Sequence, residues 1–291
     1  MSGMMGLFPI AAITDEFSPT DLDAALAGMA AVGMNGAELR VAFGKNMIDL
    51  SDEEIDQVRR AVEARGMQVV SLASPLLKCV LPESPPLDSR VQHDVFGSAH
   101  TFEDQPRLTR RAFEVAERCG AGLIRVFSYW RTVEPERTYG MVAEALNELG
   151  EEAGKRGIVI ALENEHACNV STGAETGKLL ETFRHPAVKI LWDPANASIL
   201  GENPYPDGYS SLPPDQIVHI HAKDCYVQDH KPTWGPVGEM GIDWRGQLRA
   251  LARDGYKGWI SLETHWTGPN GDKFEASTIC GRSLRELIET V

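Results

Sequence analysis

Four short apolar runs in the second half of the chain each end at a residue that can bind a hard metal ion. The four terminal residues are Glu163, Asp193, His221 and Glu263. Three carboxylates and one imidazole form an oxygen-rich ligand set that suits Mn²⁺, Mg²⁺ or Co²⁺, with Zn²⁺ also open. One acid at a strand end is more often a helix cap or an ion-pair partner. Four in succession favour a shared site for one divalent ion.

The rest of the chain supplies a scaffold that could bring these residues together. Eight strand-like runs alternate with amphipathic helical segments, and several of the helical segments end at a glycine. The expected strands cover residues 8–13, 36–42, 67–72, 123–127, 158–163, 188–192, 217–221 and 259–262. Strict alternation implies a parallel sheet with helices outside it, and eight units favour a closed (β/α)8 TIM barrel. An open doubly wound sheet is disfavoured because no G-x-G-x-x-G follows the first strand.

A barrel places its active site at the carboxyl ends of the strands. The four candidate ligands would arrive there from strands five to eight, which are neighbours around the ring. We therefore expect one domain over residues 1–291, with the metal site at its carboxyl face. No low-complexity linker divides the sequence.

The stretch from Ser74 to Gln105 is unusually long for a connection between a strand and a helix, and it is rich in proline. A long irregular segment inside a compact fold is often functional. We expect an extended loop after strand 3 that forms a lid or wall over the site. His93 and His100 lie in this loop, although a solvated histidine is the plainer interpretation of each.

Composition narrows the function classes. The chain has 291 residues, a net charge of −14 and five scattered cysteines. An acidic protein repels phosphate backbones and anionic membranes, so we expect no nucleic-acid and no membrane partner. Odd, unpaired cysteines are typical of reduced thiols, and no basic leader or membrane-length apolar run is present, so we expect a cytoplasmic protein.

The sequence around the four candidate ligands resembles the xylose isomerase-like TIM barrel superfamily, the sugar phosphate isomerase/epimerase group. The motifs are Ala-Leu-Glu163-Asn-Glu-His, Trp-Asp193-Pro-Ala-Asn, His-Ile-His221-Ala-Lys-Asp and Ser-Leu-Glu263-Thr. The resemblance implies one divalent metal, most simply Mn²⁺, held by these four residues. It also implies that Glu163 and Glu263 are catalytic, as acid and base next to a carbonyl, with the metal stabilising an enediolate.

One position departs from the epimerase pattern. Several epimerases carry a histidine three residues after the aspartate, where this chain has Asn196. We predict that Asn196, His166, Lys223 and Trp130 contact the substrate. Arg131 and Trp266 are weaker candidates for the same wall, and Glu38 and Arg40 are possible polar contacts. For His219, packing or a hydrogen bond behind the sheet is the expected role.

Three functions stay open. The first is a metal-dependent isomerase or epimerase acting on a sugar, ketose or sugar phosphate by proton transfer. The second is a lyase or dehydratase, for example on a 3-oxo-glycoside or a dehydroshikimate-like substrate, which needs the same site plus an acid for the leaving group. The third is a non-catalytic barrel, disfavoured because a buried carboxylate cluster without metal is costly. The superfamily's three-zinc DNA endonucleases are disfavoured by charge and missing ligands. A small-molecule carbohydrate is the expected partner, and a homo-oligomer stays open.

Overall fold

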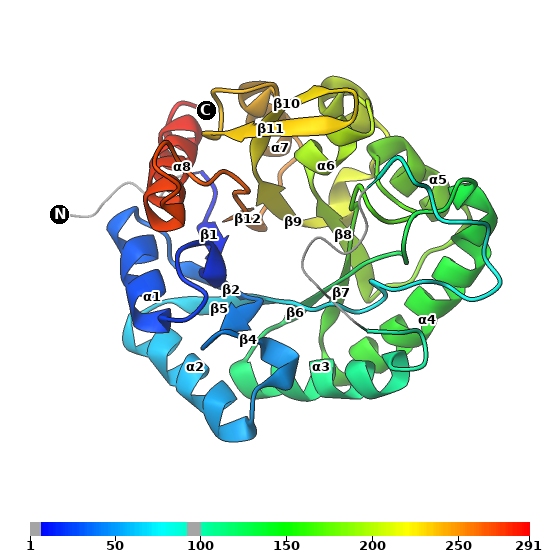
Figure 1. Cartoon of the computed structure of the whole chain (residues 1–291), viewed down its shortest axis with the longest axis horizontal. Helices are drawn as coiled ribbons and strands as arrows, with labels where there is room; N and C mark the ends of the chain where they lie inside the picture. The colour runs from blue at the N-terminus through cyan, green and yellow to red at the C-terminus, as the bar shows by residue number, and fades with distance from the viewer. Residues whose placement is uncertain (1–6, 92–99) are drawn as a thin grey trace.

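A computed structural model describes residues 7–91 and 100–291 of the chain. Eight parallel strands form a closed barrel in the order β1-β12-β9-β8-β7-β6-β5-β2, and helices surround it (Figure 1). The strands are β1 (Ile10–Ile13), β2 (Gly36–Leu39), β5 (Gln68–Ala73), β6 (Leu123–Val126), β7 (Val159–Glu163), β8 (Val188–Trp192), β9 (Ile217–Ala222) and β12 (Trp259–Leu262). The predicted (β/α)8 barrel is therefore confirmed.

The surrounding helices begin and end where local sequence signals predict. They are α1 (Leu22–Ala31), α2 (Asp52–Ala64), α3 (Gln105–Cys119), α4 (Tyr139–Arg156), α5 (Gly173–Thr182), α7 (Trp244–Arg253) and α8 (Lys273–Glu289). Ser51 and Glu54 form a reciprocal capping box at the start of α2. Gly120 and Gly157 end α3 and α4 in the left-handed conformation, with φ of 81° and 67°.

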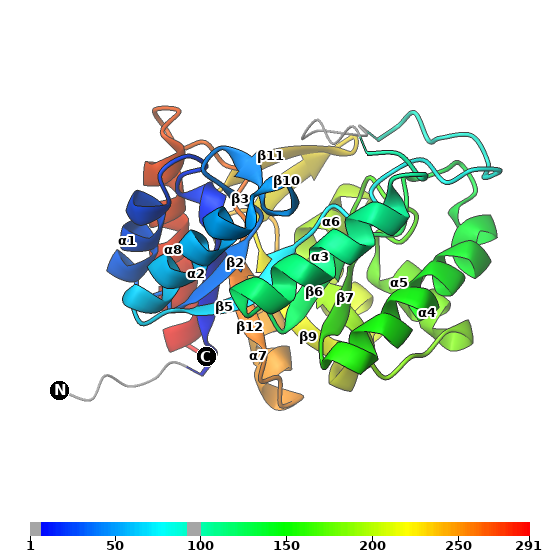
Figure 2. The ribbon, with the colours of Figure 1, turned by 90° about the horizontal axis from the view of Figure 1, so that it is seen from below.

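Two insertions lie on the same side of the barrel, at the carboxyl ends of the strands (Figure 2). The first is the extended loop after β5, which was predicted. Its backbone carbonyls at Leu76, Leu77 and Cys79 accept hydrogen bonds of 2.8–3.0 Å from residues 127–130. The second is a hairpin of β10 (Asp224–Gln228) and β11 (Lys231–Gly235) that follows β9. The two insertions give the barrel mouth its walls.

Three local predictions differ from the structure. The second strand ends at Leu39 and not at Ala42, because residues 41–42 pair with residues 45–46 in a separate small hairpin of β3 (Val41–Ala42) and β4 (Lys45–Asn46). The sequence predicts a glycine-rich loop over residues 233–242, but residues 233–235 belong to β11. A short helix, α6 (Pro194–Ile199), follows Asp193 and was not predicted.

Short 3-10 and π turns complete the chain: η1 (Thr14–Glu16), η2 (Met47–Asp49), η3 (Pro135–Thr138), η4 (Pro204–Gly208) and η5 (Pro214–Gln216). Within the described residues, none of the helices has the length and apolar character required to cross a membrane.

Candidate metal centre

The four predicted ligands meet at the carboxyl end of the barrel. Glu163 is the last residue of β7, His221 lies near the end of β9, and Asp193 and Glu263 directly follow β8 and β12. Each contributes one ligand atom to a group in which all four atoms lie within 4.8 Å of one another. All four residues are buried, Glu263 being the most exposed at 4%. The spacing of strand ends thus brings together the residues that the sequence singled out.

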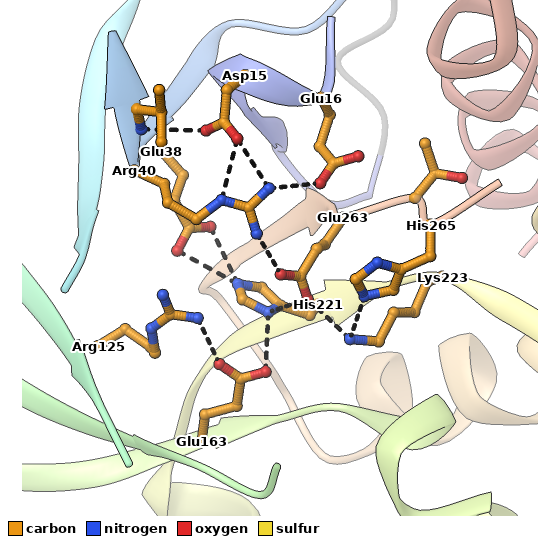
Figure 3. Close-up of polar contacts among 12 residues, drawn as sticks. Asp15, Glu16, Glu38, Arg40, Arg125, Glu163, His221, Lys223, Glu263 and His265 are labelled. Atoms are coloured by element: carbon orange, nitrogen blue, oxygen red, sulfur yellow. Dashed lines mark hydrogen bonds and ion pairs between the residues drawn. The ribbon is translucent and has the colours of Figure 1, made fainter. Parts of the chain in front are cut away.

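His221 provides the point on which the three carboxylates converge. Its Nδ1 atom lies 3.1 Å from Glu263 Oε2, 3.4 Å from Glu163 Oε1 and 3.9 Å from Asp193 Oδ2. Figure 3 shows Glu163 and Glu263 approaching the ring from different sides. Within the described part of the chain, this buried Nδ1 makes no hydrogen bond. The oxygens that surround it belong to carboxylates, which accept hydrogen bonds, so a neutral ring with its hydrogen on Nε2 presents here a lone pair that a cation can take.

The opposite oxygen of each carboxylate is held by a donor from the protein. Arg125 Nη1 donates to Glu163 Oε2 at 2.8 Å, and Arg40 Nη1 donates to Glu263 Oε1 at 2.9 Å. The backbone N–H of Asn196 donates to Asp193 Oδ1 at 3.0 Å, so Asp193 is also the N-cap of α6. Each carboxylate is therefore turned so that its other oxygen faces His221.

Lys223 lies among these inward-facing oxygens. Its Nζ atom is 2.8 Å from both Asp193 Oδ2 and Glu263 Oε2. Burial would lower the pKa of Lys223, but the carboxylates outweigh it and hold that pKa well above its ordinary value. With Arg40 and Arg125, this lysine compensates much of the acidic charge. The sequence-based argument that the cluster is too costly without metal overlooked these three cations.

Burial and charge act in opposite directions on the ligands themselves. Burial raises the pKa of Asp193. Burial would also raise the pKa of Glu263, but Lys223 and His221 outweigh it and hold that pKa well below its usual range. For Glu163, His221 and Arg125 likewise outweigh burial and lower the pKa. The two glutamates are thus ionised, as metal ligands must be.

The residues present fit a divalent cation. The donors are three carboxylate oxygens and one imidazole nitrogen that lie within 4.8 Å of one another, and among the described residues the buried Nδ1 atom of His221 makes no hydrogen bond. This hard set matches Mg²⁺, Mn²⁺ or Zn²⁺ chemistry. A cation at this point would compete with Lys223 Nζ for Asp193 and Glu263.

A cavity of about 730 Å³ opens above the cluster. Arg40, Arg125 and Glu263 contribute to its lining near the cluster, and the extended loop contributes Lys78 and His100. Aromatic and imidazole side chains line much of the remainder. They are Phe127, Trp130, His166, His230, Trp234 and His265. A cavity of this size with a few convergent polar groups is suited to a small polar ligand.

His166 lines this cavity with one ring nitrogen already engaged. Its Nδ1 atom is 2.9 Å from Glu165 Oε1 and 3.1 Å from Asn196 Oδ1. Asn196 in turn donates from Nδ2 to Glu163 Oε1 at 3.2 Å, which connects His166 to the cluster. Burial would lower the pKa of His166, but Glu165 outweighs it and raises the pKa above its ordinary value. His166 therefore can hold a proton near neutral pH.

The predicted substrate contacts fall into two groups. Trp130 and His166 line the cavity. Asn196 and Lys223 are buried against the acidic cluster and are not among the described residues of the cavity wall. Their direct contact with a substrate stays a prediction.

The weaker candidates also differ in position. Arg131 is buried and pairs with Glu175 at 2.7 Å, away from the cavity lining. His219 makes a buried hydrogen bond to Glu38 at 2.9 Å, but this bond lies in the barrel interior, where Glu38 also contacts His221, and not behind the sheet as expected. His100 lines the cavity, whereas His93 lies outside the described residues.

Several residues of the site were not found from the sequence. Arg125 is a charged residue inside an apolar strand, a signal that was present but not used. Asp15 and Glu16 form ion pairs with Arg40 at 2.9 Å and 2.7 Å (Figure 3). The sequence signal for these two acids was their position directly after the first predicted strand. Trp234 and His265, with ring centroids 4.7 Å apart, meet only because the β10–β11 hairpin folds back.

Comparison with known sequences decides the family. The pattern that defines the xylose isomerase-like TIM barrel matches residues 25–284. The chain belongs to the xylose isomerase-like TIM barrel family. The resemblance inferred from the four motifs is therefore confirmed.

Proteins to which this chain is similar carry different names. A protein named inosose dehydratase from Bacillus thuringiensis (strain Al Hakam) is 22% identical over 97% of this chain and 96% of its own length. The fold matches 3-keto-D-glucoside 4-epimerase from E. coli, at 18% identity and a TM-score of 0.66, over 96% of this chain and 98% of that one. It also matches a xylose isomerase-like TIM barrel protein from Mycobacterium smegmatis in complex with magnesium, at 16% identity and a TM-score of 0.68, over 99% of each chain.

Proposed function

We propose that this chain is a divalent-metal-dependent dehydratase acting on a small polyhydroxylated ketone, such as a cyclic sugar-like ketone. The observation that carries the proposal is His166, a cavity-lining imidazole whose Nδ1 is bound to Glu165 and Asn196. In this arrangement Nε2 can donate a proton to a departing hydroxyl group. Dehydration requires such a proton donor, whereas epimerisation does not. The full-length similarity to a protein named inosose dehydratase supports the same choice.

The four convergent residues would hold the metal ion. When bound, a divalent ion supplies Lewis-acid polarisation of the substrate carbonyl and so acidifies the neighbouring C–H bond. Mn²⁺ is our expectation from the hard ligand set, and the magnesium complex of a similar fold supports a hard cation. The remaining chemistry belongs to side chains of the chain.

Glu163 is the better candidate for the base. Its Oε2 is paired with Arg125, whereas Oε1 contacts the neutral Asn196 amide and the His221 ring. Glu263 has both oxygens paired with cations, Oε1 with Arg40 and Oε2 with Lys223. Because each cation lowers the basicity of a carboxylate, Glu163 would accept the α-proton more readily. Glu263 would serve chiefly as a ligand.

His166 would complete the elimination. Glu163 takes the proton from the carbon next to the carbonyl, and the electron pair of that C–H bond moves toward the carbonyl oxygen. The pair then returns to form a carbon–carbon double bond as the C–O bond to the β-hydroxyl breaks. His166 Nε2 gives its proton to the departing oxygen, which leaves as water. The product is an α,β-unsaturated ketone, and general acid catalysis of this kind typically contributes roughly 10²–10⁴-fold.

The test separates proton abstraction from elimination. Candidate cyclic polyol ketones, 3-oxo-glycosides and ketoses are incubated with Mn²⁺ and protein, with enone absorbance and deuterium exchange from D₂O as readouts. The wild type should form enone. His166→Gln should lose most enone formation while α-proton exchange continues, because the base is intact. A matched variant, His185→Gln, lies outside the cavity lining and should behave as wild type. Enone formation by His166→Gln at the wild-type rate would overturn the acid assignment.

Epimerisation is the second candidate, and the paired glutamates favour it. Glu163 and Glu263 approach His221 from different sides (Figure 3), as two bases working on opposite faces of a substrate would. In that case the protein would interconvert two ketose epimers with α-proton exchange and form no enone. Glu263→Gln would then abolish exchange from one face only.

A further inference from the structure

A second buried polar group lies directly against the metal centre. Glu38 on β2 contacts both histidines of β9, although β1 and β12 separate these strands in the barrel. Glu38 Oε2 lies 2.9 Å from His219 Nε2. Both Glu38 oxygens also lie 3.2 Å from His221 Nε2 (Figure 3). All three side chains are at most 1% exposed. Glu38 therefore reaches across the barrel interior to a specific target.

These contacts determine which nitrogen of His221 is available. An ionised carboxylate only accepts hydrogen bonds, so the Nε2 atom beside Glu38 carries the hydrogen. A histidine that binds a metal ion is neutral, so in that state its lone pair is on Nδ1, the atom that faces Glu163, Asp193 and Glu263. Carboxylates that bind the far nitrogen of a metal-ligating histidine orient the ring and raise its basicity in this way.

We propose that Glu38 is a positioning residue for the metal centre, acting through His221. The proposal rests on the metal site of the proposed function, but not on the reaction that this site performs. His219 also contacts Glu38, at Oε2, and its ring lies 5.6 Å from that of His221 at an interplanar angle of 77°. Glu38 thus holds His221 Nδ1 in line with the three carboxylates.

A purely structural role makes a different prediction. If Glu38 only satisfied two buried histidines, its loss would lower the stability of the metal-free protein without changing metal affinity. A second metal ion bound by Glu38, His219 and His221 is the other alternative, because these atoms also lie within 4.8 Å of one another. That alternative predicts two ions per chain.

The experiment measures metal affinity without substrate. Mn²⁺ and Zn²⁺ are titrated into metal-free wild type, Glu38→Gln, Glu38→Asp and His219→Gln in competition with a chelating dye. Folding is checked by circular dichroism and thermal melting. Glu38→Gln should weaken affinity by about 10–100-fold, the usual effect of losing an outer-shell partner. Glu38→Asp keeps the charge but has a shorter side chain, so its metal affinity should lie between those of the wild type and Glu38→Gln. His219→Gln keeps the Glu38–His221 contact and should bind metal nearly as well as wild type.

Each outcome decides the question. Unchanged affinity in folded Glu38→Gln and Glu38→Asp overturns the proposal, whatever the enzyme proves to catalyse. Equal losses in Glu38→Gln and His219→Gln also overturn it, because the network would then act as a unit. Two ions in the wild type, with one lost in His219→Gln, replace it with a second metal site. A wild type that binds no ion rejects the metal centre and this inference together, whereas absence of dehydration alone leaves the inference standing.

Discussion

The two halves of the barrel meet at one site but contribute different side chains to it. Strands β7, β8, β9 and β12 bring the four candidate ligands to their carboxyl ends. Strands β2 and β6 bring Arg40, which follows β2, and Arg125, and each arginine holds one ligand glutamate by its outer oxygen. Glu38, also on β2, holds the histidine. The second half thus presents the candidate ligands, together with Lys223, and the first half orients the two glutamates and the histidine.

This division predicts a large and a moderate class of mutational effect. Changes in the second half should abolish catalysis or metal binding. Changes in the first half should keep the four candidate ligand residues but leave their side chains less firmly oriented. The following predictions test that contrast from the largest effect to the smallest.

Glu163→Gln should abolish most turnover. The amide keeps the shape but cannot take a proton, so the rate should fall by roughly 10²–10⁴-fold, the usual contribution of general acid–base catalysis. The measurement is α-proton exchange in D₂O, with Glu239→Gln on the exposed surface as the matched control. Exchange at the wild-type rate in Glu163→Gln would remove Glu163 from the role of base.

Arg125→Met should destabilise the metal-free protein more than it harms the metal-bound one. Glu163 is fully buried, and without Arg125 its Oε2 loses a charged partner at 2.8 Å. Breaking a buried pair in this way typically costs about 3–5 kcal/mol. Chemical denaturation with and without Mn²⁺ measures the difference. Arg137→Met removes an exposed pair and should change stability by about 0–1 kcal/mol. Equal effects of the two variants would contradict the holding role of Arg125.

The pH dependence should report His166. Its pKa is raised by Glu165, so the proton that the elimination needs is present below that pKa and is lost as pH rises through it. The value of kcat/KM for enone formation should therefore fall on the alkaline side, with a midpoint above the ordinary histidine pKa. This alkaline limb of the pH profile should be absent from the residual activity of His166→Gln. A limb that survives in this variant belongs to another group.

Trp130→Ala should have the smallest effect. The indole lines the cavity and is not one of the four candidate ligands. Loss of an aromatic contact worth about 0.5–1.5 kcal/mol should raise KM about two- to tenfold and leave kcat nearly unchanged. Steady-state kinetics on the best substrate checks this. A fall in kcat without a change in KM would place Trp130 closer to the reacting atoms.

The same contrast between the halves explains what the sequence could predict. The ligands were predictable because each follows an apolar run, and parallel strands bring such ends to one face. Glu38 and Arg40 were noted only as polar residues near strand two. Their partners His221 and Glu263 lie 183 and 223 residues away, and no local pattern encodes that pairing.

Turn geometry accounts for the other differences. Asp229 and His230 at the hairpin tip adopt positive φ values of 50° and 60°. Glycine or asparagine is typical of such positions and would have indicated a tight turn in the sequence. The β10–β11 hairpin and the position of Trp234 therefore escaped prediction. The extended loop was predicted because its length and prolines are visible in the sequence. Its side chains Leu76, Leu77 and Leu81 are buried, whereas Val80 is 51% exposed.

Metal binding by the wild type and by Asp193→Asn tests the account most directly. Protein stripped with a chelator is dialysed against Mn²⁺, and the bound metal is counted by elemental analysis beside an isothermal titration. The account predicts one divalent ion per chain in the wild type and a large loss of affinity in folded Asp193→Asn. A wild type without bound ion, or an Asp193→Asn variant that binds as tightly as the wild type, would contradict it.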